Sequence, residues 1–550
     1  MTPVAGIDIG NATTEVVIGH REGDEVRVLA AGRAPTRRGK GSPESLDGAA
    51  RLLRRLERRH GVQVARAVAA PLRPVLTGGV SLPEATADTG RLWVVGAGSE
   101  TAGGQGFGAG RPVLLGRPVG DGPVVVVVPS RTGYVAAAEA VSDLLSRTSV
   151  TAVLLESDEA VLVSHRLPES VPVVDEVPVE QVLGAEVVAV EVSSGGRPLQ
   201  VLTDPFKLRT AVGLSQEELG HAARLAPLLF DTTNAVVGVG GAPPRRDDAD
   251  GWIELADGRR LPFLAGHEEV ASGTVGAARG YAVPPHLERH DVGDLWSVDL
   301  AAVARAVQAR RASARSRPVG IAALRASAPY VDPSDALADL LGVPVVTVAS
   351  EASAARAGAL STPGAGGDVV VVDLGGGTID AMTSAREVVA AGAGDLVTTA
   401  VAALTGTTNA AAEWVKRGPA GRVEAPQVLL LEDGSRSFLE RPAARETIGS
   451  LVVDGPAGML PFSRSMAPGE WRALRLRVKV DVVGGNIARA LRTLSAAPGA
   501  VVVVGGSAGD EEVLSAVSGA LPAGTVVARG NVGGRLGHRY AVAYGLLLLT

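Results

Sequence analysis

The sequence predicts a multidomain α/β protein, and three observations lead to that expectation. A chain of 550 residues is too long for one compact domain, so two to four domains are expected. Buried apolar strands such as Val124–Val128 alternate with helical stretches such as Tyr134–Leu145. Apolar residues make up 46% and charged residues 20% of the chain, which is the composition of a globular protein with a sizeable core.

Composition and charge exclude several classes of protein. The chain has no cysteine, which rules out disulfides, thiolate metal sites, iron–sulfur clusters and cysteine nucleophiles. The net charge is −6 and no basic patch is interleaved with aromatics, so nucleic acid is not an expected partner. The N-terminus lacks the features of an export signal, and apolar runs such as Leu546–Leu549 are too short to span a bilayer. We therefore expect a cytoplasmic protein without a membrane partner.

The first elements along the chain are a strand pair and a helix. Val4–Ile9 is a buried strand and Glu15–Ile18 continues it after a turn. A helix begins after Ser42, a good capping residue, and ends before Gly61. Val64–Ala70 is a further strand candidate.

After residue 85 the pattern changes to a second α/β region. A glycine-rich stretch precedes a strand–helix–strand unit made of Val124–Val128, Tyr134–Leu145 and Val150–Leu155. Val171–Val174 and Glu186–Val192 add strands, and the polar stretch Pro243–Asp250 closes the region. We interpret it as an inserted domain.

The rest of the chain returns to α/β patterning, after an acidic and arginine-rich stretch around 291–318. The expected elements are strand Val343–Val348, helix Glu351–Leu360, strand Asp368–Asp373, a helix over 472–494, strand Val501–Val504 and helix Tyr540–Leu549. Residues 405–470 are irregular and proline-rich, which suggests a second insertion.

Two glycine turns led by an aspartate carry the chemistry. In the first, Asp8 ends a strand and a turn follows with Gly10, Asn11, Ala12, Thr13 and Thr14. Backbone N–H groups in such a turn can hold phosphate oxygens, and the carboxylate can hold Mg²⁺ through water. Taken alone, the motif is equally compatible with an ordinary hairpin.

The second turn has the same pattern of residues and lies about two-thirds along the chain. Asp373 ends an apolar strand and is followed, after Leu374, by Gly375, Gly376, Gly377 and Thr378. Three successive glycines cost conformational entropy, which makes sense where a backbone must touch a ligand. A third strand, Val501–Val504, opens into Gly505, Gly506 and Ser507 and fits a loop that contacts adenosine. The ordered set predicts a nucleotide site far better than any one motif.

This ordered set resembles the actin, sugar-kinase and heat-shock ATPase superfamily, in which two similar lobes clamp ATP. The resemblance implies connecting helices at Glu351–Leu360 and, after Asn531–Gly534, at Ala541–Gly545. It places Glu351 near the attacking water, although a capping or solvent-facing Glu351 is the alternative. Mg²⁺ would be water-linked to Asp8 or Asp373, and Asp373 or Glu351 would orient the water.

A closer resemblance is to the large subunit of the diol dehydratase-reactivating factor, also called glycerol dehydratase reactivase. It is carried in order by Ala5–Val16, Thr101–Gly104, Asp158–Arg166, Pro172–Val177, Thr362–Asp380, Ala391–Thr398 and the segment from Gly530. The family implies an ATP-dependent chaperone for adenosylcobalamin-dependent diol or glycerol dehydratases. Its ADP state binds inactivated dehydratase and releases damaged cobalamin, and ATP then frees the apoenzyme.

The resemblance also implies partners, domains and a second metal site. The partner is a small subunit, in a complex of two large and two small chains. The implied domains are a first ATPase part (1–85), an inserted swivelling domain (86–245), a linking segment (246–335), a second ATPase lobe (336–404), an insertion (405–470) and a C-terminal ATPase part (471–550). At the small-subunit contact, Thr101, Asp158 and Asp175 would hold Mg²⁺ or Ca²⁺. Without this resemblance, Asp158 and Asp175 would be interpreted as ordinary acidic residues in loops.

Two alternatives from other classes stay open at this point. A small-molecule kinase of the same superfamily would need an acid to activate a substrate hydroxyl, and Asp380 is available. A cytoskeletal filament protein is the other, although the insertion at 86–245 argues against it. A radical-enzyme activase is excluded, because it needs cysteine ligands for its cluster.

Overall fold

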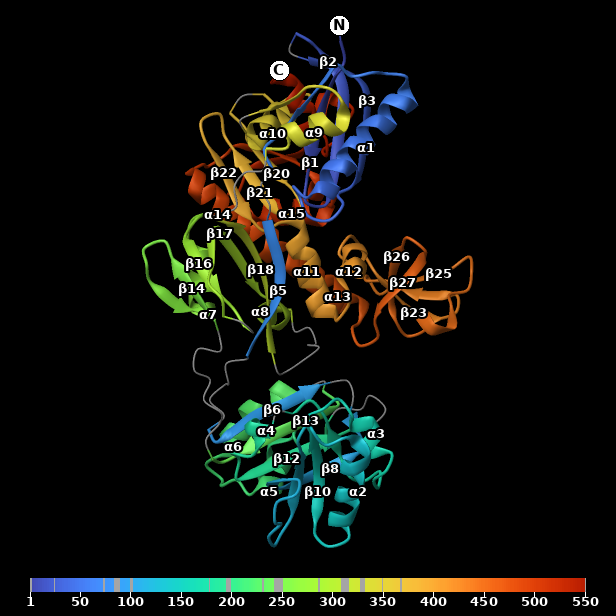
Figure 1. Ribbon diagram of the computed structural model, residues 1–550, viewed down its shortest axis with the longest axis vertical. Coiled ribbons are helices and arrows are strands. Elements are labelled where there is room, and N and C mark those ends of the chain that lie inside the picture. Colours follow the sequence, from blue (N-terminus) through green and yellow to red (C-terminus); the bar gives the residue numbers. More distant parts are fainter. Residues whose placement is uncertain are drawn as a thin grey trace. The chain divides into compact units, whose positions relative to one another are not determined.

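The computed structural model forms two compact units, which are described separately. It describes residues 2–23, 25–72, 75–83, 90–98, 102–177, 179–193, 199–229, 232–241, 251–284, 287–307, 316–326, 332–348, 350–366 and 368–549 (Figure 1). The first unit comprises 1–80, 250–309 and 318–550, and the second comprises 81–249 and 310–317. Within the described ranges, no helix combines the length and the apolar character needed to cross a membrane.

The first unit contains two sheets with the same topology. In one, the order is β19-β4-β1-β2-β3, and in the other it is β22-β21-β20-β28-β29. Central strands β1 and β20 each pair antiparallel with the next strand along the chain and parallel on the other side. The strands are β1 (Val4–Ile9), β2 (Thr13–Glu22), β3 (Glu25–Pro35), β4 (Arg66–Ala69), β19 (Val345–Thr347), β20 (Val370–Leu374), β21 (Thr378–Met382), β22 (Glu387–Ala391), β28 (Ala500–Val504) and β29 (Val526–Arg529). Two equivalent lobes therefore frame this unit.

Helices cover and connect these two sheets (Figure 1). Connecting helices α10 (Glu351–Leu360) and α16 (Ala541–Leu548) cross so closely that a Cβ on Gly545 would lie 1.8 Å from the carbonyl oxygen of Ala354. Glycine is thus needed at the crossing. The other helices are α1 (Pro43–His60), α9 (Ser334–Leu341), α11 (Gly394–Thr405), α12 (Asn409–Val415), α13 (Pro468–Lys479), α14 (Gly485–Leu494) and α15 (Glu511–Ala520), with a π-helical turn at Val480–Gly484 between α13 and α14.

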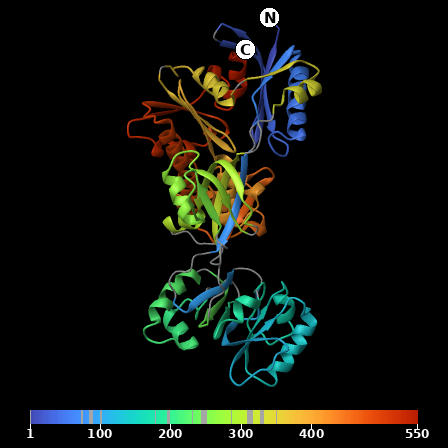
Figure 2. The same ribbon diagram turned by 60° about the vertical axis from the view of Figure 1, so that its left-hand side comes forward.

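A third sheet occupies residues that the sequence suggested were a linking segment. Its order is β15-β14-β16-β17-β18-β5, and Figure 2 shows β5, in blue, among the green strands. The elements are β5 (Val75–Pro83), β14 (Trp252–Leu255), β15 (Arg260–Pro262), α7 (Phe263–Ser272), β16 (Ala278–Ala282), β17 (His290–Asp299), α8 (Leu300–Ala306) and β18 (Ser316–Arg325). The stretch around 291–318, which the sequence showed only as acidic and arginine-rich, includes most of β17 and all of α8. Strand β17 was not recognised in the sequence because it contains several charged residues, one of which, Asp294, is buried.

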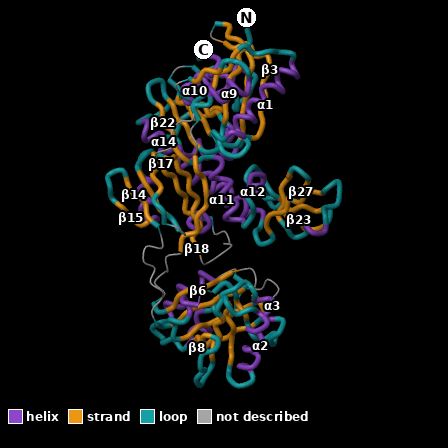
Figure 3. Tube along the Cα trace, viewed as in Figure 1, coloured by secondary structure: helices purple, strands orange, loops and turns teal. Residues whose placement is uncertain are grey.

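The proline-rich stretch 405–470 also contains a sheet. It has the antiparallel order β25-β24-β23-β26-β27, and Figure 3 shows it as strands and loops beside α12. The strands are β23 (Gly421–Ala425), β24 (Val428–Leu430), β25 (Arg436–Phe438), β26 (Leu451–Gly455) and β27 (Gly458–Ser463).

The second unit is built on one eight-stranded sheet. Its order is β6-β13-β12-β8-β9-β10-β11-β7, with parallel pairing from β8 to β11. The elements are β6 (Leu92–Gly98), β7 (Ala102–Gly103), β8 (Gly106–Leu114), β9 (Val124–Val128), α2 (Tyr134–Leu145), β10 (Val150–Leu155), α3 (Ala160–Ser164), β11 (Val173–Val174), α4 (Val179–Val182), β12 (Val187–Val192), α5 (Pro205–Val212), α6 (Leu219–Leu225) and β13 (Asn234–Val239). The predicted strand–helix–strand unit is present with the expected boundaries.

Candidate functional site

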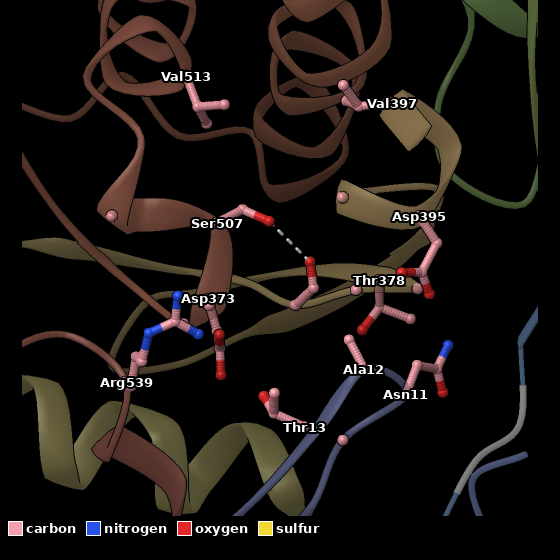
Figure 4. Close-up of a pocket in the computed structure, with 18 of the residues that line it drawn as sticks. Asn11, Ala12, Thr13, Asp373, Thr378, Asp395, Val397, Ser507, Val513 and Arg539 are labelled. Carbon is pink, nitrogen blue, oxygen red and sulfur yellow. Dashed lines mark hydrogen bonds between the residues drawn. The ribbon is translucent and has the colours of Figure 1, made fainter. Parts of the chain in front are cut away.

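The two aspartate-led turns converge on one cleft in the first unit. The cleft has a volume of about 460 Å³ and is lined by Asp8 from β1 and by Asp373 from β20; Asp373 is labelled in Figure 4. Both turns close in the same way: Gly10 N donates to Thr13 O at 2.9 Å, and Gly375 N donates to Thr378 O at 3.0 Å. Because β1 and β20 hold equivalent positions in their sheets, the turns that follow them are also equivalent and lie on opposite walls of the cleft.

Nearly all of the residues proposed to contact nucleotide lie on this cleft. They are Asp8, Gly10, Asn11, Ala12, Thr13, Glu351, Asp373, Gly375, Gly376, Gly377, Thr378, Gly505, Gly506 and Ser507. Thr14 is the exception, since it is 2% exposed and its hydroxyl lies 3.0 Å from that of Thr36. Alternate residues of a strand face opposite sides, so Thr13 and Glu15 reach the cleft and Thr14 does not.

Glycine is required where the turns approach each other and the acids. A Cβ on Gly377 would lie 2.0 Å from Nδ2 of Asn11, in the opposite turn. Gly505 has φ +90°, and a Cβ there would lie 2.1 Å from Oδ1 of Asp373. Neither position has room for a side chain, which accounts for the glycines that the sequence singled out.

The second turn is held by neighbouring backbone. Gly392 N donates to Gly377 O at 2.7 Å, and Asp395 N donates to Gly376 O at 2.8 Å. The hydroxyl of Ser507 donates to Gly375 O at 3.2 Å, the bond drawn in Figure 4. The start of α11 and the loop after β28 therefore position the glycine turn.

Buried carboxyl groups form the acidic centre of the cleft. The pKa of Asp8 is raised well above its usual range, and that of Asp373 is raised to about 7. The largest cause is burial, followed by the nearby charges of Glu351 and Glu15. Burial, then Glu351 and Asp373, also raise the pKa of Asp380 well above its usual range. Oδ1 of Asp380 is buried and has no hydrogen-bond partner among the described residues. Acidic side chains therefore outnumber cations in this centre.

Lys40 partly offsets this acidity, and sequence reasoning missed it. Its Nζ lies 2.8 Å from Oε2 and 3.0 Å from Oε1 of Glu351, and the lysine side chain is only 8% exposed. Burial lowers the pKa of Lys40, but Glu351 and Asp8 raise it more, so the net shift is upward. Glu351 is thus neither solvent-facing nor the cap of α10, which is Ser350. The only sequence signal for Lys40 is its place between two glycines, Gly39 and Gly41.

The donor set fits a hydrated divalent cation. No group of three or more acidic or histidine side chains in the described ranges is arranged to bind a metal ion directly. Mg²⁺ keeps several waters and binds through one or two carboxylates plus phosphates, so separated acids with an unpartnered oxygen on Asp380 suit it.

The other end of the cleft is apolar, with an ionic rim. It is lined by Val397 of α11, Val483 and Val513 of α15, and Figure 4 shows Val397 and Val513 at this end. Val483 lies in the π-helical turn, a feature often found at functional sites. Lys479 Nζ lies 2.6 Å from Oδ2 of Asp510. A purine base is the apolar part of a nucleotide, and this end suits it.

Comparisons with known proteins agree over the whole chain. The model for the diol dehydratase reactivase ATPase-like domain matches residues 282–550, and that for the DD-reactivating factor swiveling domain matches residues 92–240. The diol dehydratase-reactivating factor large subunit of Klebsiella michiganensis is 31% identical, over 100% of this chain and 98% of its own length. The chain belongs to this family of reactivating-factor large subunits.

Further relatives support the family and its fold. The propanediol dehydratase-reactivating factor large subunit of Salmonella typhimurium is also 31% identical, over 100% of this chain and 98% of its own length. The structure of diol dehydratase-reactivating factor in nucleotide-free form has a TM-score of 0.61 at 27% identity, covering 100% of this chain and 99% of that one. A glycerol dehydratase reactivase has a TM-score of 0.60 at 27% identity, with the same coverage. The predicted two-lobed ATPase fold with a swivelling domain is confirmed, and this reactivating-factor chain is an ATPase that binds nucleotide.

The second acidic site proposed for this reactivating-factor chain is only partly described. Asp175 is 4% exposed and its Oδ2 accepts from Ala160 N at 3.0 Å. Asp158 is exposed, yet it helps burial to raise the pKa of Asp175, so the two carboxyls are neighbours. Thr101 lies outside the described residues, and it precedes Ala102, which pairs with Val174.

Proposed function

We propose that this chain uses ATP binding and hydrolysis to reactivate an inactivated adenosylcobalamin-dependent diol or glycerol dehydratase. The observation that supports it most is the convergence of both aspartate-led turns on one cleft, in a chain related along its full length to reactivating-factor large subunits. In this proposal the ADP state binds the damaged dehydratase and frees its cobalamin, and ATP releases the apoenzyme. A small-molecule kinase is the alternative, with Asp380 as its base.

The cleft supports hydrolysis by positioning and electrostatics. Backbone N–H groups of Asn11–Thr13 and Gly376–Thr378 would hold the phosphates from two sides, while those of Gly10 and Gly375 close the turns. Asp8 and Asp373 would hold Mg²⁺ through water, and the ion would neutralise charge on the phosphate oxygens. Asp373, Glu351 or Asp380 would orient the water that attacks the γ-phosphorus, so that ATP and water yield ADP and inorganic phosphate. The ion pair with Lys40 holds the carboxylate of Glu351 in place.

We assign the small-subunit contact to the swivelling domain. Thr101, Asp158 and Asp175 would bind Mg²⁺ or Ca²⁺ there together with a group from the partner, in a complex of two large and two small chains. Two neighbouring carboxyls, one of them buried, support the assignment, since oxygen ligands suit these ions. The domain division proposed from the sequence (1–85, 86–245, 246–335, 336–404, 405–470 and 471–550) is kept, and we place the complex in the cytoplasm, where ATP is available.

Client capture should depend on the nucleotide. With its small subunit and dehydratase inactivated by cyanocobalamin, the chain is expected to bind the client at least about tenfold more tightly in ADP than in ATP, within the usual range of allosteric coupling. Gel filtration and cobalamin absorbance of the released fraction measure both steps.

The same mixture separates the reactivase from the kinase alternative. A reactivase turns ATP into ADP and inorganic phosphate only, whereas a kinase with glycerol or 1,2-propanediol present makes a phosphorylated polyol. Equal client binding in both nucleotides, or a phosphorylated diol, would contradict the proposal.

A further inference from the structure

The cations on the cleft wall fall into two groups. Six basic side chains line it: Arg33, Lys40, Lys416, Arg417, Lys479 and Arg539. Four of these have a carboxylate partner within ion-pair distance: Lys40 with Glu351, Lys416 and Arg417 with Glu413, and Lys479 with Asp510 and Glu512. Arg33 and Arg539 have no such partner among the described residues. Two guanidinium groups on the cleft wall, those of Arg33 and Arg539, are therefore available to bind an anion.

Arg539 is fixed at the loop that follows β28. Gly505 N donates to the carbonyl oxygen of His538 at 2.9 Å, which ties the chain before Arg539 to the glycine loop. A Cβ on Gly506 would lie 3.2 Å from Nη1 of Arg539, so the guanidinium lies against this glycine. The loop joins β28, which ends beside Asp373, to α15, which carries Val513. Figure 4 shows the guanidinium of Arg539 beside Asp373, and Val513 lies farther along the same wall.

The surroundings of Arg539 hold more positive than negative charge. Burial, and then Arg33, lower the pKa of Arg539, whereas Glu15 raises it. Burial, and then Arg539, lower the pKa of His538 to about 4, so this imidazole is neutral. Glu15 is already engaged by the hydroxyl of Thr13 at 2.8 Å. The guanidinium of Arg539 is half-buried and that of Arg33 is exposed, and an anion beside them would offset the repulsion between their charges.

We propose that Arg539 binds a non-transferred phosphate of the nucleotide, with Arg33 adding positive charge at the rim. This assignment rests on the ATP site proposed above and names the side chain that holds its phosphates in both nucleotide states. The γ-phosphate belongs beside Asp8 and Asp373, and the base belongs near Val513. The α- and β-phosphates then lie along the Gly505–Gly506 loop, next to the guanidinium of Arg539. Arg539 therefore binds ADP as well as ATP.

Nucleotide titration of the full chain by calorimetry tests the assignment. Arg539→Gln is expected to weaken both ADP and ATP binding by roughly 10- to 100-fold, the usual size of one charge-assisted hydrogen-bonded contact. Adenosine, which has no phosphate, is expected to bind to within about threefold of wild type. Arg539→Lys keeps the charge but loses the fork geometry, so it is expected to fall in between.

Arg535→Gln is the matched control, because Arg535 is exposed and lies in the same segment but not on the cleft. The assignment fails if Arg539→Gln binds ADP as wild type does, or if adenosine binding falls as much as ADP binding. A wild-type chain that binds no ADP would refute the ATP site itself and this assignment with it. Wild-type binding with an unchanged Arg539→Gln refutes the assignment alone.

Discussion

Asp8→Asn and Asp373→Asn are each expected to reduce ATP hydrolysis by at least about 100-fold, the usual cost of removing one preorganised electrostatic group from an active site. Both carboxyls are buried in the cleft, one in each turn. Amides of the same size keep the packing but cannot carry the negative charge that holds a cation. Phosphate release measured with excess ATP and Mg²⁺ gives the rate.

Asp368→Asn is the control for this pair of variants. Asp368 is exposed, lies five residues before Asp373 and is not on the cleft. Its hydrolysis rate is expected to match wild type. Rates within about threefold of wild type in both cleft variants would show that the acidic centre does not act on the triphosphate.

The second large effect is on stability. Asp294→Asn is expected to lower the free energy of unfolding by about 3–5 kcal/mol, because it leaves the buried guanidinium of Arg489 without its counter-charge. Asp294 is 1% exposed and Arg489 is fully buried, with 2.6 Å between Oδ2 and Nη2. Urea unfolding of the full chain, followed by circular dichroism, measures the change.

This ion pair is part of a network that reaches the phosphate turn. Asp294 also accepts from Ala391 N at 2.8 Å, and Asn486, which Arg489 contacts, donates to Gly392 O at 2.7 Å. Gly392 in turn donates to Gly377 O. The double variant Asp294→Leu with Arg489→Leu is expected to lose less stability than Asp294→Asn, because no charge remains buried. A loss below about 1 kcal/mol for Asp294→Asn would contradict this description.

The ATPase turns could be predicted from sequence because their chemistry is local. A strand that ends in aspartate and opens into glycine specifies its own turn, and two copies specify equivalent lobes. The same holds for Tyr134–Leu145 and Glu351–Leu360, whose helix boundaries matched the prediction. In each case neighbouring residues determine the structure.

The residues that sequence reasoning missed are brought together by distant parts of the chain. Lys40 meets Glu351 across more than 300 positions, and Arg539 lies on the cleft in the segment just before the last connecting helix. The third sheet was missed because β18 takes β5 as its edge partner, a strand more than 200 positions earlier. Its strand β17 also carries the buried charge of Asp294, which broke the apolar pattern. Such pairings have no local signature.

We expect one nucleotide to lie between the two aspartate-led turns. A crystal structure of the chain with Mg²⁺ and a non-hydrolysable ATP analogue tests this directly. The expected result is a triphosphate in contact with both Gly10–Thr13 and Gly375–Thr378, with its base toward Val397 and Val513. A nucleotide bound elsewhere, or touching only one of the turns, would contradict the account.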